Sequence, residues 1–169
     1  MAKEKPSTSR LAVSRAEDGS LELRHPRCAR ARAEDLQEVS QMIAAGENEI
    51  ATDELRWLLA DCHDFLAAHK LLGDLAIADN DIRLARGHFG YAYQIGLQAI
   101  EQAGVKLLPF ARPANQPFFE AGKGLAGCLL KLGQRGLARE VIRRLLELDP
   151  SDPSNVRNLT DGARRGRSK

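Results

Sequence analysis

The sequence of 169 residues contains no long hydrophobic run, because no apolar stretch approaches the ~18–20 residues that a membrane-spanning helix needs. Its first ten residues, MAKEKPSTSR, are charged and lack the apolar segment of a secretory signal. Cysteine is also scarce: Cys28, Cys62 and Cys128 are an odd number and show no CxxC spacing. We therefore expect a protein without a disulfide framework, in the reducing environment of the cytoplasm and away from membranes.

Aromatic residues make up only 5% of the chain and the net charge is only +2, whereas 43% of the residues are hydrophobic. Aliphatic side chains therefore have to build the core, and the length fits one ordinary domain. The small net charge hides an uneven distribution. Residues 1–32 hold eight basic and four acidic residues (+4), residues 33–156 twelve and eighteen (−6), and residues 157–169 five and one (+4). The sequence thus predicts an acidic body between two basic ends.

Apolar residues recur with the 3.6-residue period of a helix between residues 33 and 148. Gly46, Asn80 and Gly133 fall at turns within this pattern, which predicts six helices in three pairs. Residues 104–117 contain three prolines and are therefore predicted to form a loop or an extended segment. Together these patterns predict an all-α domain at residues 33–148.

The two ends of the chain differ from this helical part. Alternating apolar and polar residues flank Asp18-Gly19, a pair that suits a tight turn, and they predict a small hairpin within residues 1–32. Because an isolated two-stranded hairpin is marginal in water, we expect this basic segment to be flexible or loosely docked. Residues 149–169 are poor in apolar side chains, so we expect this basic tail to fray.

A repeat with a period of 34 residues runs through the helical part. Each copy has a turn residue, a small residue five positions later, and apolar residues four and seven positions after that. The copies are Gly46, Ala51, Leu55 and Leu58; Asn80, Ala85, Phe89 and Ala92; and, after an insertion, Gly133, Ala138, Ile142 and Leu145. The small residue lets two antiparallel helices approach closely near their turn. Since one helix pair cannot bury its apolar stripe alone, neighbouring pairs are expected to stack.

This pattern resembles the tetratricopeptide repeat. The third copy, GLAGCLLKLGQRGLAREVIRRLLELDP, is the most similar, and the second contains the Leu72-Gly73 pair, whereas the first fits well only in its second helix. The resemblance implies a right-handed superhelical stack of about three antiparallel helix pairs. Its repeats would lie at residues 32–65, 66–99 and 119–152, with an insertion at residues 100–118.

The resemblance also implies where a partner would bind, because the first helices of such pairs line a concave groove that holds a peptide or a partner helix. By sequence frame, nine candidate residues would face this groove: Gln37, Ser40, Lys70, Asp74, Ile77, Lys123, Gly127, Leu130 and Lys131. Lys70 and Lys123 stand where family members that grip a peptide carboxylate place a cation. Asp74 would repel that carboxylate, so the implied groove carries mixed charge.

Other motifs are weaker candidates for chemistry. Residues 122–127 match the dinucleotide fingerprint GxGxxG, but no strand precedes them, and we interpret the glycines as positions of close helix packing. Cys62, His63, His69 and His88 could hold a metal or a nucleophile. Adjacent residues such as Cys62 and His63 point roughly 100° apart on a helix, however, so a buried thiol with structural or surface histidines is the simpler interpretation.

The aromatic and acidic residues also have structural explanations. Trp57, Tyr91 and Tyr93 lie on the second helices of pairs, where we expect packing between repeats. Acidic clusters fall at helix ends, where capping and solvation explain them. We therefore predict no catalytic residue, no metal and no cofactor.

The favoured functional hypothesis is a non-catalytic adaptor or assembly factor that binds a peptide or protein segment. The alternative is a nucleic-acid-associated protein whose basic ends contact phosphates while the repeats hold a partner. An enzyme or metal protein ranks third. Because the last helix pair lacks a polar capping helix, the proline loop, the tail or a homodimer would have to cover its exposed face.

Overall fold

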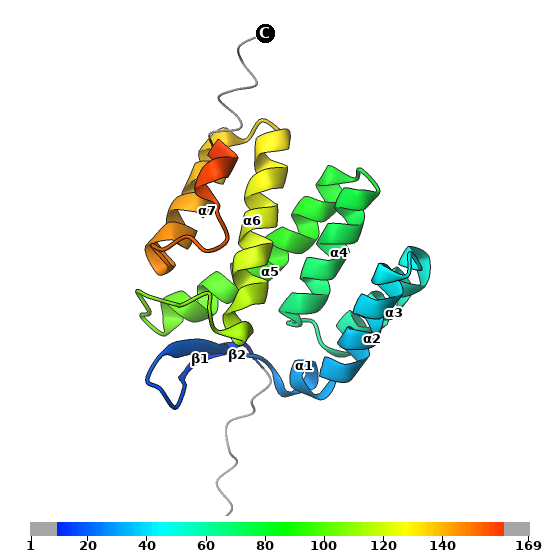
Figure 1. The fold of residues 1–169 in the computed structure, drawn as a ribbon, viewed down its shortest axis with the longest axis horizontal. Helices are drawn as coiled ribbons and strands as arrows, with labels where there is room; N and C mark the ends of the chain where they lie inside the picture. Colours follow the sequence, from blue (N-terminus) through cyan, green and yellow to red (C-terminus); the bar gives the residue numbers. More distant parts are fainter. Residues whose placement is uncertain (1–9, 161–169) are drawn as a thin grey trace, which may run out of the picture.

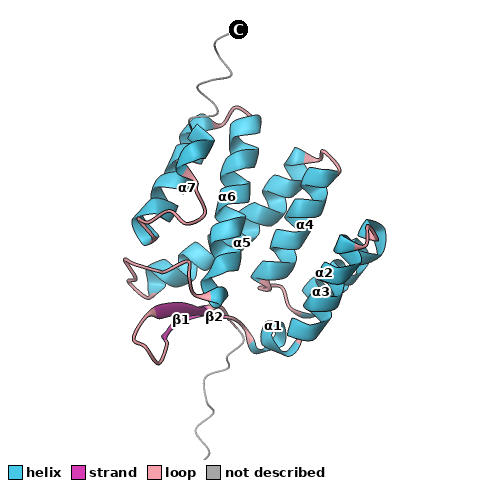
Figure 2. Ribbon diagram, in the orientation of Figure 1, coloured by secondary structure: helices cyan, strands magenta, loops and turns pink. Residues whose placement is uncertain are grey.

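Three packed pairs of helices form most of the molecule. The computed structural model describes residues 10–160, which are mostly helical and include one small hairpin (Figures 1 and 2). The elements in chain order are β1 (Ala12–Arg15), β2 (Leu21–Arg24), α1 (Arg27–Ala31), α2 (Ala33–Ala44), α3 (Asn48–Asp61), α4 (Leu66–Ala78), α5 (Ile82–Gln102), the 3₁₀ helix η1 (Pro113–Asn115), α6 (Gln116–Lys131) and α7 (Arg135–Leu148). The predicted all-α body is thus confirmed, with the hairpin beside it.

The pairs α2–α3, α4–α5 and α6–α7 share one turn geometry. Gly46, Asn80 and Gly133 adopt the left-handed conformation, with φ values of 81°, 60° and 76°, which glycine and asparagine tolerate best. In each turn the following N–H donates to the carbonyl five residues earlier: Glu47 to Met42 (2.9 Å), Asp81 to Ala76 (2.8 Å) and Gln134 to Leu129 (2.8 Å). The repeated positions in the sequence therefore correspond to repeated positions in space.

The repeated apolar positions lie in the core. The three small residues Ala51, Ala85 and Ala138 are completely buried, which lets the helices of each pair approach closely. The core consists of two clusters that both include side chains of α4. Leu72 belongs to the cluster with α1, α2 and α3, whereas Leu66 belongs to the larger cluster with α5, α6 and α7. Helix α4 therefore joins the first pair to the rest of the stack.

Close packing explains two of the glycines in the GxGxxG segment, which lies inside α6. A Cβ atom at Gly122 would come within 2.9 Å of Leu145 on α7, and one at Gly124 within 2.7 Å of Phe89 on α5. Real Cβ contacts are longer than this, so α6 could not lie as close to its neighbours with alanine at these positions. The structure supports the packing interpretation for both.

The N-terminal hairpin is docked on the helical body, contrary to the prediction of a flexible or loosely docked segment. β1 and β2 pair in antiparallel register with Val13 opposite Leu23, and the side chain of Leu23 is 1% exposed. His25 contacts the carbonyl of Ala114 through Nε2 (2.7 Å), and Arg112 forms an ion pair with Asp18. The alternation of apolar and polar residues could predict the hairpin itself. It could not predict these contacts, because they are made with a segment about 90 residues away in the sequence.

Asn115, a completely buried polar side chain, joins three parts of the chain. Its Oδ1 accepts a hydrogen bond from the Leu23 N–H (2.8 Å), while its Nδ2 donates to the carbonyls of Leu21 (3.1 Å) and Pro109 (2.8 Å). The hairpin, the proline loop and the start of α6 are therefore held by one amide. Buried amides are stable only when their hydrogen bonds are made, and here they are.

The proline loop and the tail cover the end of the last helix pair. The Leu108 N–H donates to the carbonyl of Leu148 (2.8 Å), and the Phe110 N–H donates to a carboxylate oxygen of Asp149 (2.9 Å). Val156, in the tail, is 1% exposed in the same core cluster. The tail thus packs up to residue 160 instead of fraying there, and the rest of the predicted frayed tail lies outside the described residues.

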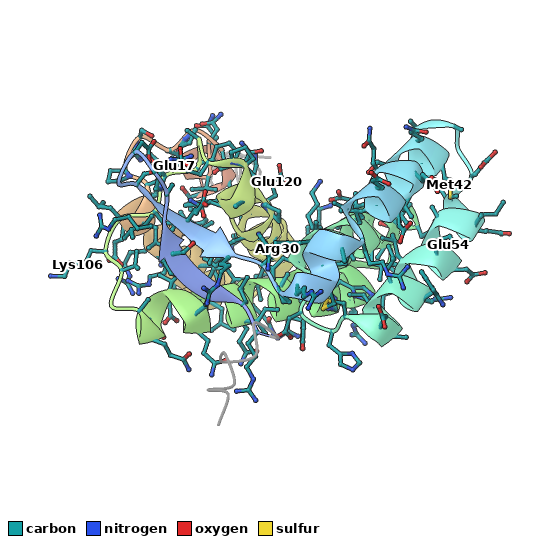
Figure 3. The ribbon with its side chains drawn as sticks, turned by 90° about the horizontal axis from the view of Figure 1, so that it is seen from below. Glu17, Arg30, Met42, Glu54, Lys106 and Glu120 are labelled. Carbon is teal, nitrogen blue, oxygen red and sulfur yellow. A yellow bond between two sulfur atoms is a disulfide. The ribbon has the colours of Figure 1, made fainter. Side chains whose placement is uncertain are left out.

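Two element boundaries also differ from the prediction. α1 lies within the segment that we expected to be flexible, and Figure 3 shows it between the hairpin and the α2–α3 pair. α6 begins at Gln116, so Pro117 lies in the first turn of a helix and not in the predicted loop. Proline is tolerated there because the first N–H groups of a helix have no acceptor within it.

A disulfide joins Cys28 on α1 to Cys62 at the C-terminal end of α3 (S–S 2.03 Å). The prediction of a chain without disulfides is therefore wrong. The prediction relied on the odd number of cysteines, but two of the three are paired and the third, Cys128, lies buried and unpaired in α6. Since disulfides persist mainly in oxidising compartments, the cysteine content no longer supports a cytoplasmic location.

Membrane-spanning helices were not expected. Within residues 10–160, no helix combines the length and the apolar character that a membrane crossing requires.

Replacing Asn115 with alanine should lower the free energy of unfolding by about 2–4 kcal/mol, because a buried N–H and two partly buried carbonyls lose their partner. Urea denaturation measures this change. The matched control is Gln98→Ala, which removes an exposed amide from α5 and should change stability by about 0.5 kcal/mol or less. Equal effects of the two substitutions would contradict the role of Asn115.

Removing the disulfide with the double substitution Cys28→Ser/Cys62→Ser should lower the free energy of unfolding. Because the bond closes a loop of 34 residues, chain entropy predicts a loss of about 3–4 kcal/mol. A reductant should destabilise the wild-type protein to a similar extent and leave the double mutant unchanged. If the wild type does not respond to the reductant, the pairing of Cys28 with Cys62 is wrong.

Candidate functional site

The residues predicted to line a concave groove lie on the first helices of the pairs, α2, α4 and α6. Gln37 and Ser40 on α2 are exposed, and the Ser40 hydroxyl donates to the carbonyl of Leu36 within its own helix (3.0 Å). Ile77 on α4 and Leu130 on α6 are half-buried and pack against the core. The two apolar candidates therefore contribute to the fold and offer only part of their surface to a partner.

The predicted groove cation Lys70 already has anionic partners. Its Nζ lies 2.6 Å from a carboxylate oxygen of Asp74 and 3.6 Å from one of Glu120 on α6. Burial opposes the charge on Lys70, but the hydrogen bond to Asp74 and the charges of Asp74 and Glu120 outweigh it and raise the pKa of Lys70. The ammonium group is thus charged and compensated within the molecule, so it exerts little attraction on a peptide carboxylate.

The second predicted cation, Lys123, is engaged by the tail. Its Nζ donates to the backbone carbonyl of Ser154 (2.7 Å), which brings the tail beside α6. Lys131 is exposed at the end of α6, and a Cβ atom at Gly127 would meet open space. The structure brings Lys70 and Asp74 together, whereas the ammonium group of Lys123 is bonded to the tail.

The cysteine and histidine candidates do not form a reactive centre. Cys62 is in the disulfide, and burial raises the pKa of the Cys128 thiol, so neither sulfur is a thiolate at neutral pH. His69 contacts the His63 carbonyl through Nε2 (2.9 Å), and its Nδ1 lies 3.4 Å from Nδ1 of His88. Burial lowers the pKa of both His69 and His88. In the part of the chain that the structure describes, no three histidine, cysteine or acidic side chains come together as metal ligands would.

The basic ends are described only in part. Arg24, Arg27 and Arg30 are exposed near the hairpin and α1, whereas Arg32 pairs with Asp35 and stacks on the ring of Trp57 (4.6 Å). The C-terminal cluster lies mainly outside the described residues, which include only Arg157 of its five cations. The nucleic-acid alternative therefore stays a prediction.

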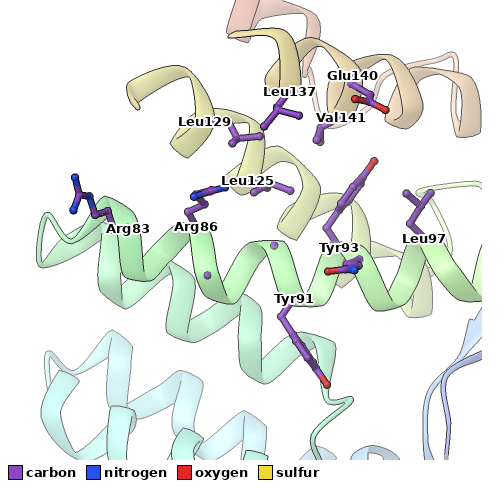
Figure 4. A pocket seen from close by; sticks show the side chains of 13 residues that line it. Arg83, Arg86, Tyr91, Tyr93, Leu97, Leu125, Leu129, Leu137, Glu140 and Val141 are labelled. Carbon is purple, nitrogen blue, oxygen red and sulfur yellow. The ribbon is translucent and has the colours of Figure 1, made fainter. Parts of the chain in front are cut away.

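A different surface, formed by the second helices, carries an open cleft. This cleft of about 820 Å³ lies between α5 and α7, with α6 as its floor (Figure 4). Leu125 and Leu129 on α6 form the floor, and Leu97 on α5 and Leu137 and Val141 on α7 form the walls. Its size and its mostly apolar lining are typical of binding sites for small molecules or partner side chains.

Tyr93 extends from α5 toward α7 at the base of this cleft (Figure 4). Burial raises the pKa of Tyr93 to about 12, so its hydroxyl is neutral at physiological pH. Tyr91 points away from α7, and its ring packs on His69 with a centroid distance of 4.6 Å. Tyr93 therefore belongs to the cleft itself, whereas Tyr91 lies at its border.

The charged residues of the cleft lie at its rim. Arg83 and Arg86 extend from the N-terminal part of α5, and Glu140 lies on α7 opposite Tyr93 (Figure 4). Between residues 10 and 160, none of these three side chains forms an ion pair or an intramolecular hydrogen bond. They differ in this respect from Lys70 and Lys123, and their charges are available to a partner.

Two glycines of α5, Gly87 and Gly90, also line the cleft. A Cβ atom at Gly87 would have no neighbour within 4 Å, and one at Gly90 would meet only Leu125, at an ordinary distance of 3.7 Å. Internal packing thus gives no reason for glycine at either position, although glycine destabilises a helix by about 1 kcal/mol relative to alanine. By contrast, a Cβ atom at Gly96 would lie 2.4 Å from Phe118, so packing explains that glycine.

Most of the exposed large apolar residues belong to the second helices. Among residues 10–160, five of six are on α3, α5 and α7, namely Ile50, Trp57, Leu84, Tyr91 and Leu137, and the sixth, Leu107, is in the proline loop. The expectation that Trp57 and Tyr91 pack between repeats is wrong, because Trp57 is 52% exposed and the Tyr91 ring, 40% exposed, packs on His69 of its own helix pair, while buried Tyr93 fits it. The signal in the sequence was apolar residues outside the repeated buried positions, such as Leu84 and Leu137.

Comparison of the chain with protein-family models, with curated proteins and with solved structures gave no match. The assignment of a function therefore depends on the geometry of this molecule.

The double substitution Gly87→Ala/Gly90→Ala should raise the free energy of unfolding by about 1–2 kcal/mol, because both side chains fit and alanine favours the helix. The contrasting control is Gly124→Ala, whose Cβ would overlap Phe89 and should destabilise the protein. Urea denaturation distinguishes the two results. Destabilisation by Gly87→Ala/Gly90→Ala would show that the fold itself requires these glycines.

Proposed function

We propose that this protein is a non-catalytic interaction module that binds a segment of another protein in the cleft between α5 and α7. The observation that carries the proposal is an apolar cleft that stays open although the surrounding helices are well packed. Leu137, at its edge, is 50% exposed. Apolar side chains that a monomer leaves in contact with water around a concave surface are typical of interaction sites.

The proposal places the partner on a different side from the groove expected by resemblance. Lys70 and Lys123 are occupied by Asp74, Glu120 and the tail, so they favour a structural role. Arg83, Arg86 and Glu140 at the cleft do not have such partners among the described residues. Free charges around an apolar centre can orient a partner, while the apolar contacts supply most of the affinity.

We further propose that the three helix pairs are tetratricopeptide-like repeats used as a scaffold. The identical left-handed turns and the buried alanines at the repeat positions support this interpretation. The non-catalytic character is supported by the chemistry of the candidate nucleophiles, since Cys62 is bonded and Cys128 is buried. No cofactor has a part in the proposed function.

A library of random linear peptides displayed on phage tests this function, with the full chain as the target. We expect a selection to yield peptides that bind the wild-type protein and lose at least about tenfold in affinity on Leu137→Asp, since a charge then enters the apolar contact. Leu137 is half exposed, so the substitution should leave the fold intact.

The matched control for this selection is Leu84→Asp, which changes an equally exposed leucine of α5 outside the cleft. The selected peptides should bind this variant as they bind the wild type. Some selected peptides could bind Leu137→Asp as tightly as the wild type but bind Lys70→Glu/Lys123→Glu more weakly. That result would place the site in the concave groove and reject the cleft. A selection without any cleft-dependent peptide would likewise reject it.

A further inference from the structure

From the shape and charge of the cleft, which we have proposed as the binding site, we infer the class of its partner: an amphipathic α-helix with acidic residues at one end. This inference rests on the proposed function and extends it. Three features carry it, namely the length of the cleft, its two glycines, and its uncompensated arginines.

The length and the backbone of the cleft favour a helical partner. Along α5 the lining residues run from Arg83 to Leu97, which at 1.5 Å per residue is about 21 Å, or roughly four turns of a helix. The N–H and carbonyl groups of α5 and α7 are used within these helices, so the walls offer no strand edge to an extended peptide. A helix satisfies its own backbone and needs only an apolar face.

The glycines allow a partner helix to come close. Gly87 and Gly90 lie three positions apart, one turn of α5, and both border the cleft. Because neither supports internal packing, their effect is to leave a shallow strip without side chains on the wall of α5. Helix axes separated by side chains lie about 8–10 Å apart, and a strip of glycine permits a shorter distance. The apolar side chains of the partner can then reach Leu125 and Leu129 on the floor.

The charges fix the chemistry of one end of the partner. Arg83 and Arg86 are exposed at the N-terminal end of α5, with no acidic partner in residues 10–160. Two adjacent cations beside an apolar cleft favour a ligand with carboxylates at the corresponding end. Glu140, on the opposite wall and further along the cleft, disfavours a partner that is acidic along its entire length.

The parts of this chain outside the described residues do not fit this description. Residues 1–9 contain Met1 as their only large apolar residue, and residues 161–169 contain none. Both segments also carry net positive charge, which Arg83 and Arg86 would repel. These two segments therefore do not supply the occupant, and we assign it to another protein.

Synthetic peptides with a stated charge pattern test the inference on the full chain. The acidic probe is a helical peptide of about four turns, with leucines on one face and a pair of glutamates at one end. The basic probe has lysines in place of the glutamates, and a third probe carries a central proline that breaks the helix. Since the polarity of the partner is not fixed, each charged probe is made with its charges at either end.

We expect the acidic probe to bind the wild-type protein at least about tenfold more tightly than the basic probe or the proline probe. The charge reversal Arg83→Glu/Arg86→Glu should invert this preference, so that the basic probe binds better than the acidic one. Such an inversion requires the charged end to lie at these arginines. If the acidic probe binds the charge-reversed variant as tightly as the wild type, the inference is wrong.

Gly87→Ala/Gly90→Ala gives a second test with the same acidic probe. This variant should be more stable than the wild type and yet bind the probe at least about tenfold more weakly, because the methyl groups block the approach of the helix. Gly127→Ala is the matched control, since it changes a helical glycine that also faces open space and does not line the cleft. It should not weaken binding of the probe.

The outcomes separate this inference from the proposed function. If display selection yields peptides that depend on Leu137 but contain proline or lack acidic residues, the function stands and the helical acidic partner is rejected. If light scattering shows a dimer that Leu137→Asp dissociates, a second copy occupies the cleft and the inference is also rejected. A selection in which no peptide depends on Leu137 rejects the function itself.

Discussion

One buried amide, that of Asn115, holds three segments of the chain together and supports the rest of the fold. An amide offers two donor hydrogens and an acceptor oxygen, and here all three functions bind the backbone of the hairpin or of the proline loop. Losing one of these segments would leave hydrogen-bonding groups of the buried amide without partners, which costs free energy. The amide thereby fixes the path of the loop, which brings Leu108 and Phe110 to the end of α7.

The same arrangement decides which surfaces of the stack remain open. A stack of helix pairs exposes apolar residues at its last pair unless something covers them. The loop and Val156 of the tail fulfil this role, which makes the dimer considered from the sequence unnecessary for the core. Lys123 binds the tail and Lys70 binds Glu120, so the side of the first helices is also largely used by internal contacts. The second helices keep exposed leucines, and this contrast is the basis for proposing them as the interaction side.

The sequence predicted those features that follow from local rules. The turns at Gly46, Asn80 and Gly133 and the six helices could be predicted, because left-handed turns and helical periodicity leave marks at fixed spacing. The docking of the hairpin could not, because Asn115 lies 92 residues from Leu23 and has no pattern around it. The disulfide could not be predicted either, because the odd cysteine count hid it and because Cys28 lies in α1, before the first predicted repeat, whereas Cys62 lies at the end of α3.

The candidate site was harder to predict because periodicity reveals what a protein buries, whereas a binding surface consists of what it leaves exposed. Gly87 and Gly90 show the difference. Gly73, Gly96 and Gly124 lack a side chain because Phe89 or Phe118 fills the space, so the fold regains in packing what it loses in helix propensity. At Gly87 the space is empty and at Gly90 a methyl group would fit against Leu125 at 3.7 Å, so the loss of stability has no internal compensation. Glycine lowers the stability of the helix at these positions, but it also lets a partner approach the backbone of α5 beside the apolar cleft. Such a loss of stability is expected where a residue serves binding and not packing.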